Sequence, residues 1–170
     1  LATKSNFLET AYLLLHGELP VSSQFEQFDR SIRYHTMLNE SLLRFFNGFH
    51  YNAHPMAMVS AVVSSMAAFY HDSMDNNNPR HREIFAHRIL AKIPTVSAAA
   101  FKHMLGQPFV YPSNDLDYCA NFLNMMFAIP AQAYAVSPAV REALNLLLIL
   151  HADHEQNCST STVRSRSMRS

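Results

Sequence analysis

The sequence predicts an all-α protein of seven or eight helices without a significant sheet, and three observations support this fold class. Apolar residues recur at helical spacing along most of the chain, and no segment alternates as a half-buried strand does. The three glycines, Gly17, Gly48 and Gly106, each follow a candidate helix, where a left-handed residue often ends it. Proline, serine and asparagine stand where helices are expected to begin.

The first helix is expected over "FLETAYLLLH", which is followed by Gly17. Ser23 and Glu26 have the spacing of a capping box, so a second helix is expected to begin there. Three apolar residues share one face of that helix: Phe25, Phe28 and Ile32. A third candidate helix, "LLRFFN", ends at Gly48.

Prolines mark the next helices. Pro55 opens an apolar run over residues 55–70, which is too short for a membrane span and is expected to be a buried helix. Asn78 and Pro79 start a helix over "RHREIFAHRILAKI", and Pro94 is expected to stop it. Four of its apolar residues are expected to face inward: Ile84, Phe85, Ile89 and Leu90. Four charged residues are expected to face outward or sideways: Arg82, Glu83, Arg88 and Lys92.

Three helices complete the chain. Thr95 is expected to begin a separate helix over "VSAAAFKHML", which Gly106 ends. Asp115 is expected to cap a helix over "LDYCANFLNMMFA". The last helix starts at Ser137 and Pro138, and its apolar end "LNLLLIL" leads into the polar string "HADHEQNCSTSTVR" of residues 151–164.

Composition excludes several classes of function. Lysine plus arginine equals aspartate plus glutamate, 13 against 13, so no net field attracts nucleic acid or an anionic membrane. Every glycine follows a helix, so none is left for a GxGxxG or P-loop nucleotide site. Cys119, expected in the core, and Cys158 fit a reducing, cytoplasmic compartment, with a targeting segment upstream of residue 1 left open. Residues 159–170 hold almost nothing apolar and are expected to be disordered.

The residues of the polar string leave three interpretations open. His151 and His154 can share one helical face, where histidines cap the last carbonyls of a helix. They can bind zinc with Cys158 or Glu155, although the spacing matches no familiar zinc pattern. They can also donate hydrogen bonds to a small organic anion, together with the hydroxyl groups that follow.

Another group of histidines has the appearance of a metal site. His71, His81 and His87 lie close in sequence, but Pro79 divides them between a turn and a helix. Zinc requires three or four ligands at about 2.0–2.3 Å, and histidines divided in this way are not expected to meet around one ion. No metal is therefore expected.

The string "LLLILHADHEQNCSTSTVR" closely resembles the bacterial-type (type II) citrate synthases. Other strings resemble that family in the same order, among them "HPMAMVSAVVSSMAAFYHDS", "NNPRHREIFAHRILAKIPT" and "GQPFVYPSNDLDYCANFLNMMF". The resemblance covers residues 1 to 164 and implies that residues 1–158 form part of a large helical domain. It also implies an acyltransferase that condenses acetyl-CoA with oxaloacetate, at entry to the tricarboxylic acid cycle, without a cofactor.

The resemblance also implies roles for individual residues. His154 matches the oxaloacetate-binding histidine of the family, and Asn157 and Ser159 match positions near that pocket. His151 and Asp153 match positions that orient the turn. The "GPxHG" and "GHR" strings and the later aspartate segment of the family are absent, so no catalytic residue is expected in this chain. A truncated chain, inactive alone, is the expectation.

Bacterial-type hexameric members can be inhibited by NADH, and eight positions match that allosteric site: His35, Thr36, Met37, Tyr70, Arg88, Lys92, Gln107 and Asn114. Arg88 and Lys92 would offer two cations to a pyrophosphate, or be merely a solvated helix face. Tyr34 replaces a basic residue, and Ala131 replaces a reactive cysteine of some members. Losing one cation costs about 1–3 kcal/mol, so weak or absent NADH control is expected.

Two alternatives accompany the main interpretation. The chain can be a non-catalytic interaction protein, in which the runs 55–70 and 95–105 expose apolar faces to a partner subunit. It can also belong to a 2-methylcitrate synthase that uses propionyl-CoA. The resemblance implies a homo-oligomer, either a dimer or a hexamer of dimers, for the full-length protein.

Overall fold

The computed structural model describes residues 4–153 and confirms the all-α fold class. Its seven α-helices are α1 (Phe7–His16), α2 (Ser22–Tyr34), α3 (Glu40–Phe45), α4 (Pro55–Ser65), α5 (Pro79–Met104), α6 (Tyr118–Phe127) and α7 (Pro138–Leu150). Three short 3₁₀ turns follow α3 and α4: η1 (Phe46–Gly48), η2 (Met66–Ala68) and η3 (His71–Ser73). Within residues 4–153, extended pairing is limited to one isolated bridge between Ile129 and Gln132.

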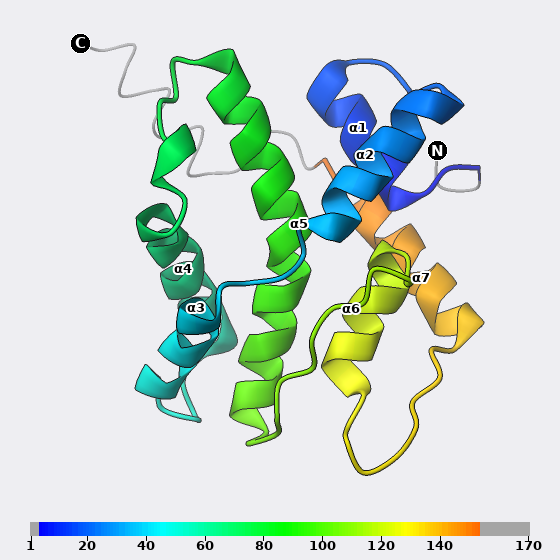
Figure 1. Ribbon diagram of the computed structural model, residues 1–170. Helices are drawn as coiled ribbons and strands as arrows, with labels where there is room; N and C mark the ends of the chain where they lie inside the picture. Colours follow the sequence, from blue (N-terminus) through cyan, green and yellow to red (C-terminus); the bar gives the residue numbers. More distant parts are fainter. Residues whose placement is uncertain (1–3, 154–170) are drawn as a thin grey trace.

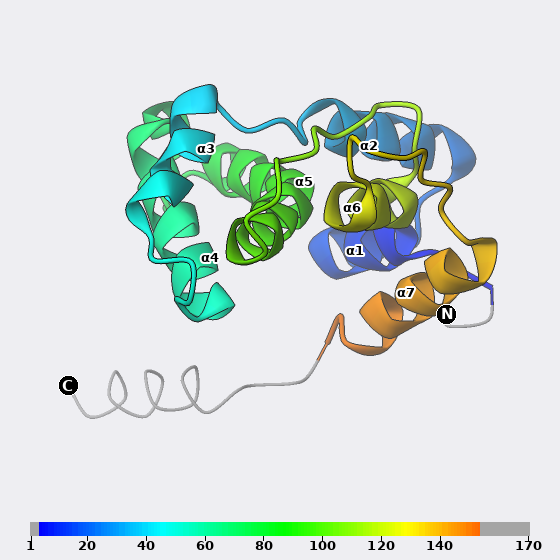
Figure 2. The same cartoon turned by 90° about the horizontal axis from the view of Figure 1, so that it is seen from below.

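Helix α5 lies between two groups of helices (Figures 1 and 2). On one side α3 and α4 build a core with α5 from ten buried residues: Leu38, Leu42, Leu43, Phe46, Met58, Val62, Met66, Val96, Ala99 and Ala100. On the other side α1 and α2 pack near the first half of α5 in a smaller core: Leu8, Tyr12, Phe28, Ile32 and Ala91. Helix α6 also contacts α5, and α7 packs on α1 and α6 at the edge of the molecule.

The expectation that Pro94 stops a helix is wrong, because α5 continues through it for 26 residues. A proline lacks the N–H that would bond to the carbonyl four residues earlier, which here is Leu90. That carbonyl receives a hydrogen bond from the hydroxyl of Tyr118 on α6, at 3.0 Å. A residue from a distant part of the chain thus replaces the missing donor. Because the helix is continuous, Thr95 lies inside α5 and does not begin a helix.

Two N-cap predictions also require correction. Helix α2 begins at Ser22, and the side chain of Gln24 accepts from the backbone N–H of Val21 at 2.9 Å, in place of a box between Ser23 and Glu26. The cap of α6 is Asp117, whose carboxylate accepts from the N–H of Ala120, and not Asp115. Each predicted N-cap lies two positions from the observed one, which is Val21 for α2 and Asp117 for α6.

Glycine has its predicted role at two of three positions. Gly17 has a φ of 82° and donates to the carbonyl of Leu13 at 2.8 Å. Gly106 has a φ of 63°, and the hydrogen bond from Gln107 N–H to the carbonyl of Lys102 closes a Schellman motif. Gly48 instead lies inside the η1 turn without a positive φ, so its prediction is wrong.

Two predicted faces differ from the structure. The run 55–70 is only half buried, since α4 buries Met58 and Val62 while Met56 on its other face is exposed. On α5, Phe85 is exposed although it was expected inside, and Lys92 is buried although it was expected outside. Cys119 is buried, as expected. Over residues 4–153, every helix is too short or too polar to cross a membrane.

Candidate functional site

The end of α7 holds the described part of the predicted oxaloacetate site. His151 caps this helix, and its Nδ1 lies 2.8 Å from the carbonyl oxygen of Leu147. His151 and Asp153 are both exposed. Their turn-orienting role stays a prediction, and His154, Asn157 and Ser159 lie outside the described residues, as do Cys158 and the tail 159–170.

Six of the eight predicted NADH-site residues come together around Lys92. The Lys92 ammonium donates hydrogen bonds to the carbonyls of His35, at 2.7 Å, and Met37. The carbonyl between them, that of Thr36, accepts from the hydroxyl of Thr95 at 2.8 Å. These contacts attach the segment between α2 and α3 to the middle of α5, so the charge of Lys92 is directed at its own chain.

Arg88 and Tyr70 complete this cluster. The guanidinium of Arg88 lies 4.4 Å from the ring centroid of Tyr70 and donates to the hydroxyl of Ser73 at 2.7 Å. It also approaches the carboxylate of Asp72, at 3.4 Å. Burial, with the nearby Arg88 cation, lowers the pKa of Lys92 to about 8. Burial likewise raises the pKa of Tyr70.

Gln107 lies apart from the six residues around Lys92. Gln107 follows the C-terminal end of α5, which the helical rise places roughly 18 Å along the axis from Lys92. Its side-chain carbonyl accepts from the buried ammonium of Lys102, at 2.8 Å. Lys102 also donates to the carbonyl of Ala128, at 2.7 Å. Asn114 is exposed in the loop between α5 and α6, and the NADH site stays a prediction.

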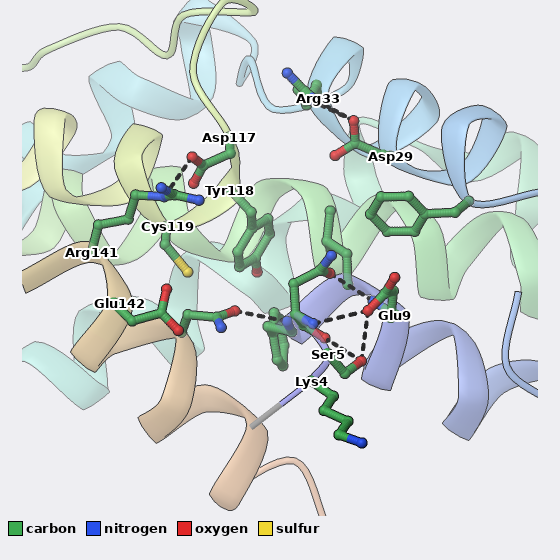
Figure 3. Close-up of a pocket in the computed structure, with 15 residues that line it drawn as sticks. Lys4, Ser5, Glu9, Asp29, Arg33, Asp117, Tyr118, Cys119, Arg141 and Glu142 are labelled. Carbon is green, nitrogen blue, oxygen red and sulfur yellow. Dashed lines mark hydrogen bonds and ion pairs between the residues drawn. The ribbon is translucent and has the colours of Figure 1, made fainter. Parts of the chain in front are cut away.

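A polar pocket of about 580 Å³ was not predicted from the sequence, and Figure 3 shows its lining. It lies where the start of α1 meets α2, α6 and α7. Two ion pairs flank it, Arg141 with Asp117 at 2.8 Å and Arg33 with Asp29. The side-chain carbonyl of Asn145 accepts from the N–H of Phe7 at 2.8 Å and ties α7 to α1. No sequence pattern indicates this pocket, because both ends of the described chain contribute to it.

The thiol of Cys119 lies in the lining of this pocket, but its environment opposes reaction. Burial is the main reason why the pKa of this thiol rises to about 12, and Asp117 adds to the effect. The neutral thiol is a weak nucleophile, so we assign Cys119 a packing role. Burial also raises the pKa of the neighbouring Tyr118, whose hydroxyl donates a hydrogen bond to the carbonyl of Leu90.

The helical architecture defines the class of protein: an all-α domain built around one long helix, whose last described helix leads into a string rich in histidine. The family model described as "Citrate synthase, C-terminal domain" matches residues 1–167. The chain therefore belongs to the citrate synthase family.

Solved structures of citrate synthases share the fold. The enzyme from Pyrobaculum aerophilum matches with a TM-score of 0.78 and 30% identity, over 91% of this chain and 39% of that chain. The enzyme from Thermotoga maritima MSB8 has a TM-score of 0.74 and 28% identity, over 94% and 39%. The Thermoplasma acidophilum enzyme, in a ternary complex with carboxymethyl coenzyme A and oxaloacetate, has a TM-score of 0.83 and 22% identity, over 94% and 40%. The chain spans about two fifths of each relative.

Proposed function

We propose that this chain contributes the oxaloacetate-binding histidine to a bacterial-type citrate synthase, which converts acetyl-CoA, oxaloacetate and water to citrate and CoA. The observation that carries the proposal is the family match over residues 1–167, which includes the "HADHEQN" string at the end of α7. The Thermoplasma relative, which was solved with oxaloacetate and a coenzyme A analogue, gives the substrates their chemical class.

His154 is the residue to which we assign substrate contact. Its imidazole N–H groups can donate to a carboxylate or keto oxygen of oxaloacetate, and Asn157 and Ser159 add polar groups nearby. The reaction also requires a base that removes a methyl proton from acetyl-CoA, a hydrogen-bond donor that stabilises the enol, and arginines that bind the carboxylates of oxaloacetate. The strings that carry these groups in the family are absent from these 170 residues, so we propose that the chain alone does not turn over.

The first experiment measures CoA release from acetyl-CoA by the purified chain in the presence of oxaloacetate. We expect a rate equal to the blank, and turnover above it would contradict the proposed division of roles. The second measures NMR spectra during titration with oxaloacetate at millimolar concentration. We expect the largest shifts near His154, abolished by His154→Ala and retained in the control His71→Ala. Shifts confined to other helices would contradict the assignment.

Two finer features belong to the same proposal. We propose acetyl-CoA as the acyl donor in the complete enzyme, and a preference for propionyl-CoA there would instead indicate a 2-methylcitrate synthase. We also propose weak or absent inhibition by NADH, because the Lys92 ammonium donates to carbonyls of its own chain. Calorimetric titration with NADH tests this; micromolar binding that Arg88→Ala removes would contradict it.

A second candidate function is packing on a partner subunit, and exposed apolar side chains favour it. On α7, Val140, Leu147 and Leu150 are about half exposed, and Met56 on α4 is exposed as well. The run 95–105 does not supply such a face, because it is mostly buried and only Met104 and Leu105 are exposed. Light scattering tests the proposal: we expect dimers or larger species, whereas a monomer at all concentrations would contradict it.

A further inference from the structure

The end of α1 meets the first turns of α5 at a cluster that the predicted activity does not use. His16 is the last residue of α1, while Glu83 and His87 lie one turn apart on α5. One ring nitrogen of each histidine and one carboxylate oxygen of Glu83 all lie within 4.8 Å of one another. They line a surface pocket of about 420 Å³, which is separate from the pocket of Figure 3.

The spacing of these three atoms is close to that of a metal site. Zinc binds imidazole nitrogen and carboxylate oxygen at about 2.0–2.2 Å, so tetrahedral ligand atoms are about 3.4 Å apart. The longest separation in the cluster therefore needs to shorten by at most about 1.4 Å to reach this geometry. Glu83 is exposed, so its side chain has room for that movement, and water can occupy the fourth position.

An independent observation concerns a ring nitrogen of His87. The Nε2 atom of His87 is buried without a hydrogen bond, and within residues 4–153 it is the one buried side-chain nitrogen or oxygen in this condition. Buried polar atoms nearly always have a partner, and an orphan of this kind is a common sign of a missing ion or water. A metal ion coordinated by Nε2 would satisfy it.

The surroundings hold the two rings in place. The His16 ring lies against the Tyr12 ring, with centroids 4.1 Å apart and planes tilted by 36°, and the His87 ring is nearly perpendicular to that of Phe28, with centroids 5.0 Å apart. Arg82 also lines the pocket, but its guanidinium donates to the carbonyl of Asn76 at 2.8 Å. The histidines are therefore positioned by packing, and the nearby cation has an acceptor outside the cluster.

We propose that His16, Glu83 and His87 bind a divalent transition-metal ion of the zinc class, which joins α1 to α5. Two imidazoles with one carboxylate suit zinc, nickel or copper, whereas calcium and magnesium prefer sites made of oxygen alone. The ion acts as a structural connection, because it holds two helices that come from distant parts of the sequence. Binding to the native chain stabilises it in proportion to the logarithm of free metal over Kd.

The test is a titration of the purified, tag-free chain with ZnCl₂, followed by calorimetry and by the midpoint of thermal unfolding. Unrelated sites near His154 and Cys158 are removed first with the background variant His154→Ala, Cys158→Ser. In this background we expect one ion per chain and a rise in the unfolding midpoint.

Variants distinguish the proposed cluster from incidental binding. Glu83→Gln keeps the size of an exposed side chain, and we expect it to weaken zinc binding at least about tenfold. His87→Ala should do the same, while the matched control His81→Ala, on the same helix but outside the cluster, should bind as the background does. Zinc affinity unchanged in Glu83→Gln and in His16→Ala, or reduced equally by His81→Ala, would overturn the proposal.

Discussion

Helices α5 and α7 differ in burial, and the difference is the opposite of what their sequences suggest. Helix α5 carries arginines, histidines and two lysines, yet nine of its residues are buried, including Lys92 and Lys102. Helix α7 ends in "LNLLLIL", yet Ile149 is its one buried residue. Local hydrophobicity therefore does not decide burial here. Helix α5 is covered because α2, α4 and α6 pack around it, whereas α7 contacts mainly α1 and α6.

The buried lysines show how α5 tolerates its polar groups. Each ammonium donates to main-chain carbonyls of a loop, those of His35 and Met37 for Lys92 and that of Ala128 for Lys102. A buried charge is costly unless it is hydrogen-bonded, and these carbonyls supply the bonds. No part of the described chain covers the exposed leucines of α7, so we expect a partner to cover them in a larger assembly.

The largest expected effect is in the core beside α5. Phe46 is fully buried against that helix, so Phe46→Ala should lower the free energy of unfolding by about 3–5 kcal/mol. Its neighbour Phe45 is 44% exposed, and the control Phe45→Ala should cost much less. Urea unfolding of both variants measures the difference. Equal losses would mean that the core is not centred on Phe46.

A smaller effect concerns the proline inside α5. Tyr118→Phe leaves the Leu90 carbonyl without its donor and should cost about 1–3 kcal/mol. In the background Pro94→Ala, the restored N–H can bond to Leu90, so the same substitution should cost less. A double-mutant cycle by urea unfolding compares the two costs. Additive effects would contradict the compensation between Tyr118 and Pro94.

The pH dependence of stability should report on Lys92. Its pKa is about 8 in the folded chain and 10.5 ordinarily, so between these values the unfolded state binds more protons. Stability from this group therefore rises with pH through that window and is lost as pH falls through 8. Urea midpoints at pH 7.5 and 9.5 measure the rise, which should be smaller in Lys92→Met. An identical pH profile in that variant would exclude Lys92 as the cause.

The smallest effect on stability is expected on α7. Leu147 is 52% exposed, so Leu147→Gln should change the free energy of unfolding by less than about 0.5 kcal/mol. The matched control Ile149→Gln, two residues away, should destabilise clearly because Ile149 is buried. Light scattering of the same variants should show that Leu147→Gln reduces association. Unchanged association would mean that this face is not the one that is covered.

Sequence patterns predicted the elements whose signals are local. The start of α5 at Asn78 and Pro79, and the face of α2 with Phe28 and Ile32, follow from capping and periodicity and were confirmed. The continuity of α5 through Pro94 depends on the hydroxyl of Tyr118, which lies on another helix. Such a long-range donor leaves no local trace in the sequence, so the helix was divided in two.

The same limit applies to the sites. The family strings indicated His154 as a substrate residue, and that assignment stays a prediction outside the described residues. The cluster of His16, Glu83 and His87 was missed because it joins two helices, and sequence proximity instead suggested His71 and His81 as companions of His87. Packing of α1 on α5 creates the cluster, and spacing along one helix reveals only the pair Glu83 and His87.

Hydrogen exchange followed by mass spectrometry at low protein concentration tests the contrast between α5 and α7 most directly. Amides in the interior of α5 should be protected nearly to the extent of global unfolding, because neighbouring helices cover them on several sides. Amides of α7 should exchange much faster and gain protection when the protein concentration is raised. Protection of α7 equal to that of α5 in the dilute monomer would contradict the account.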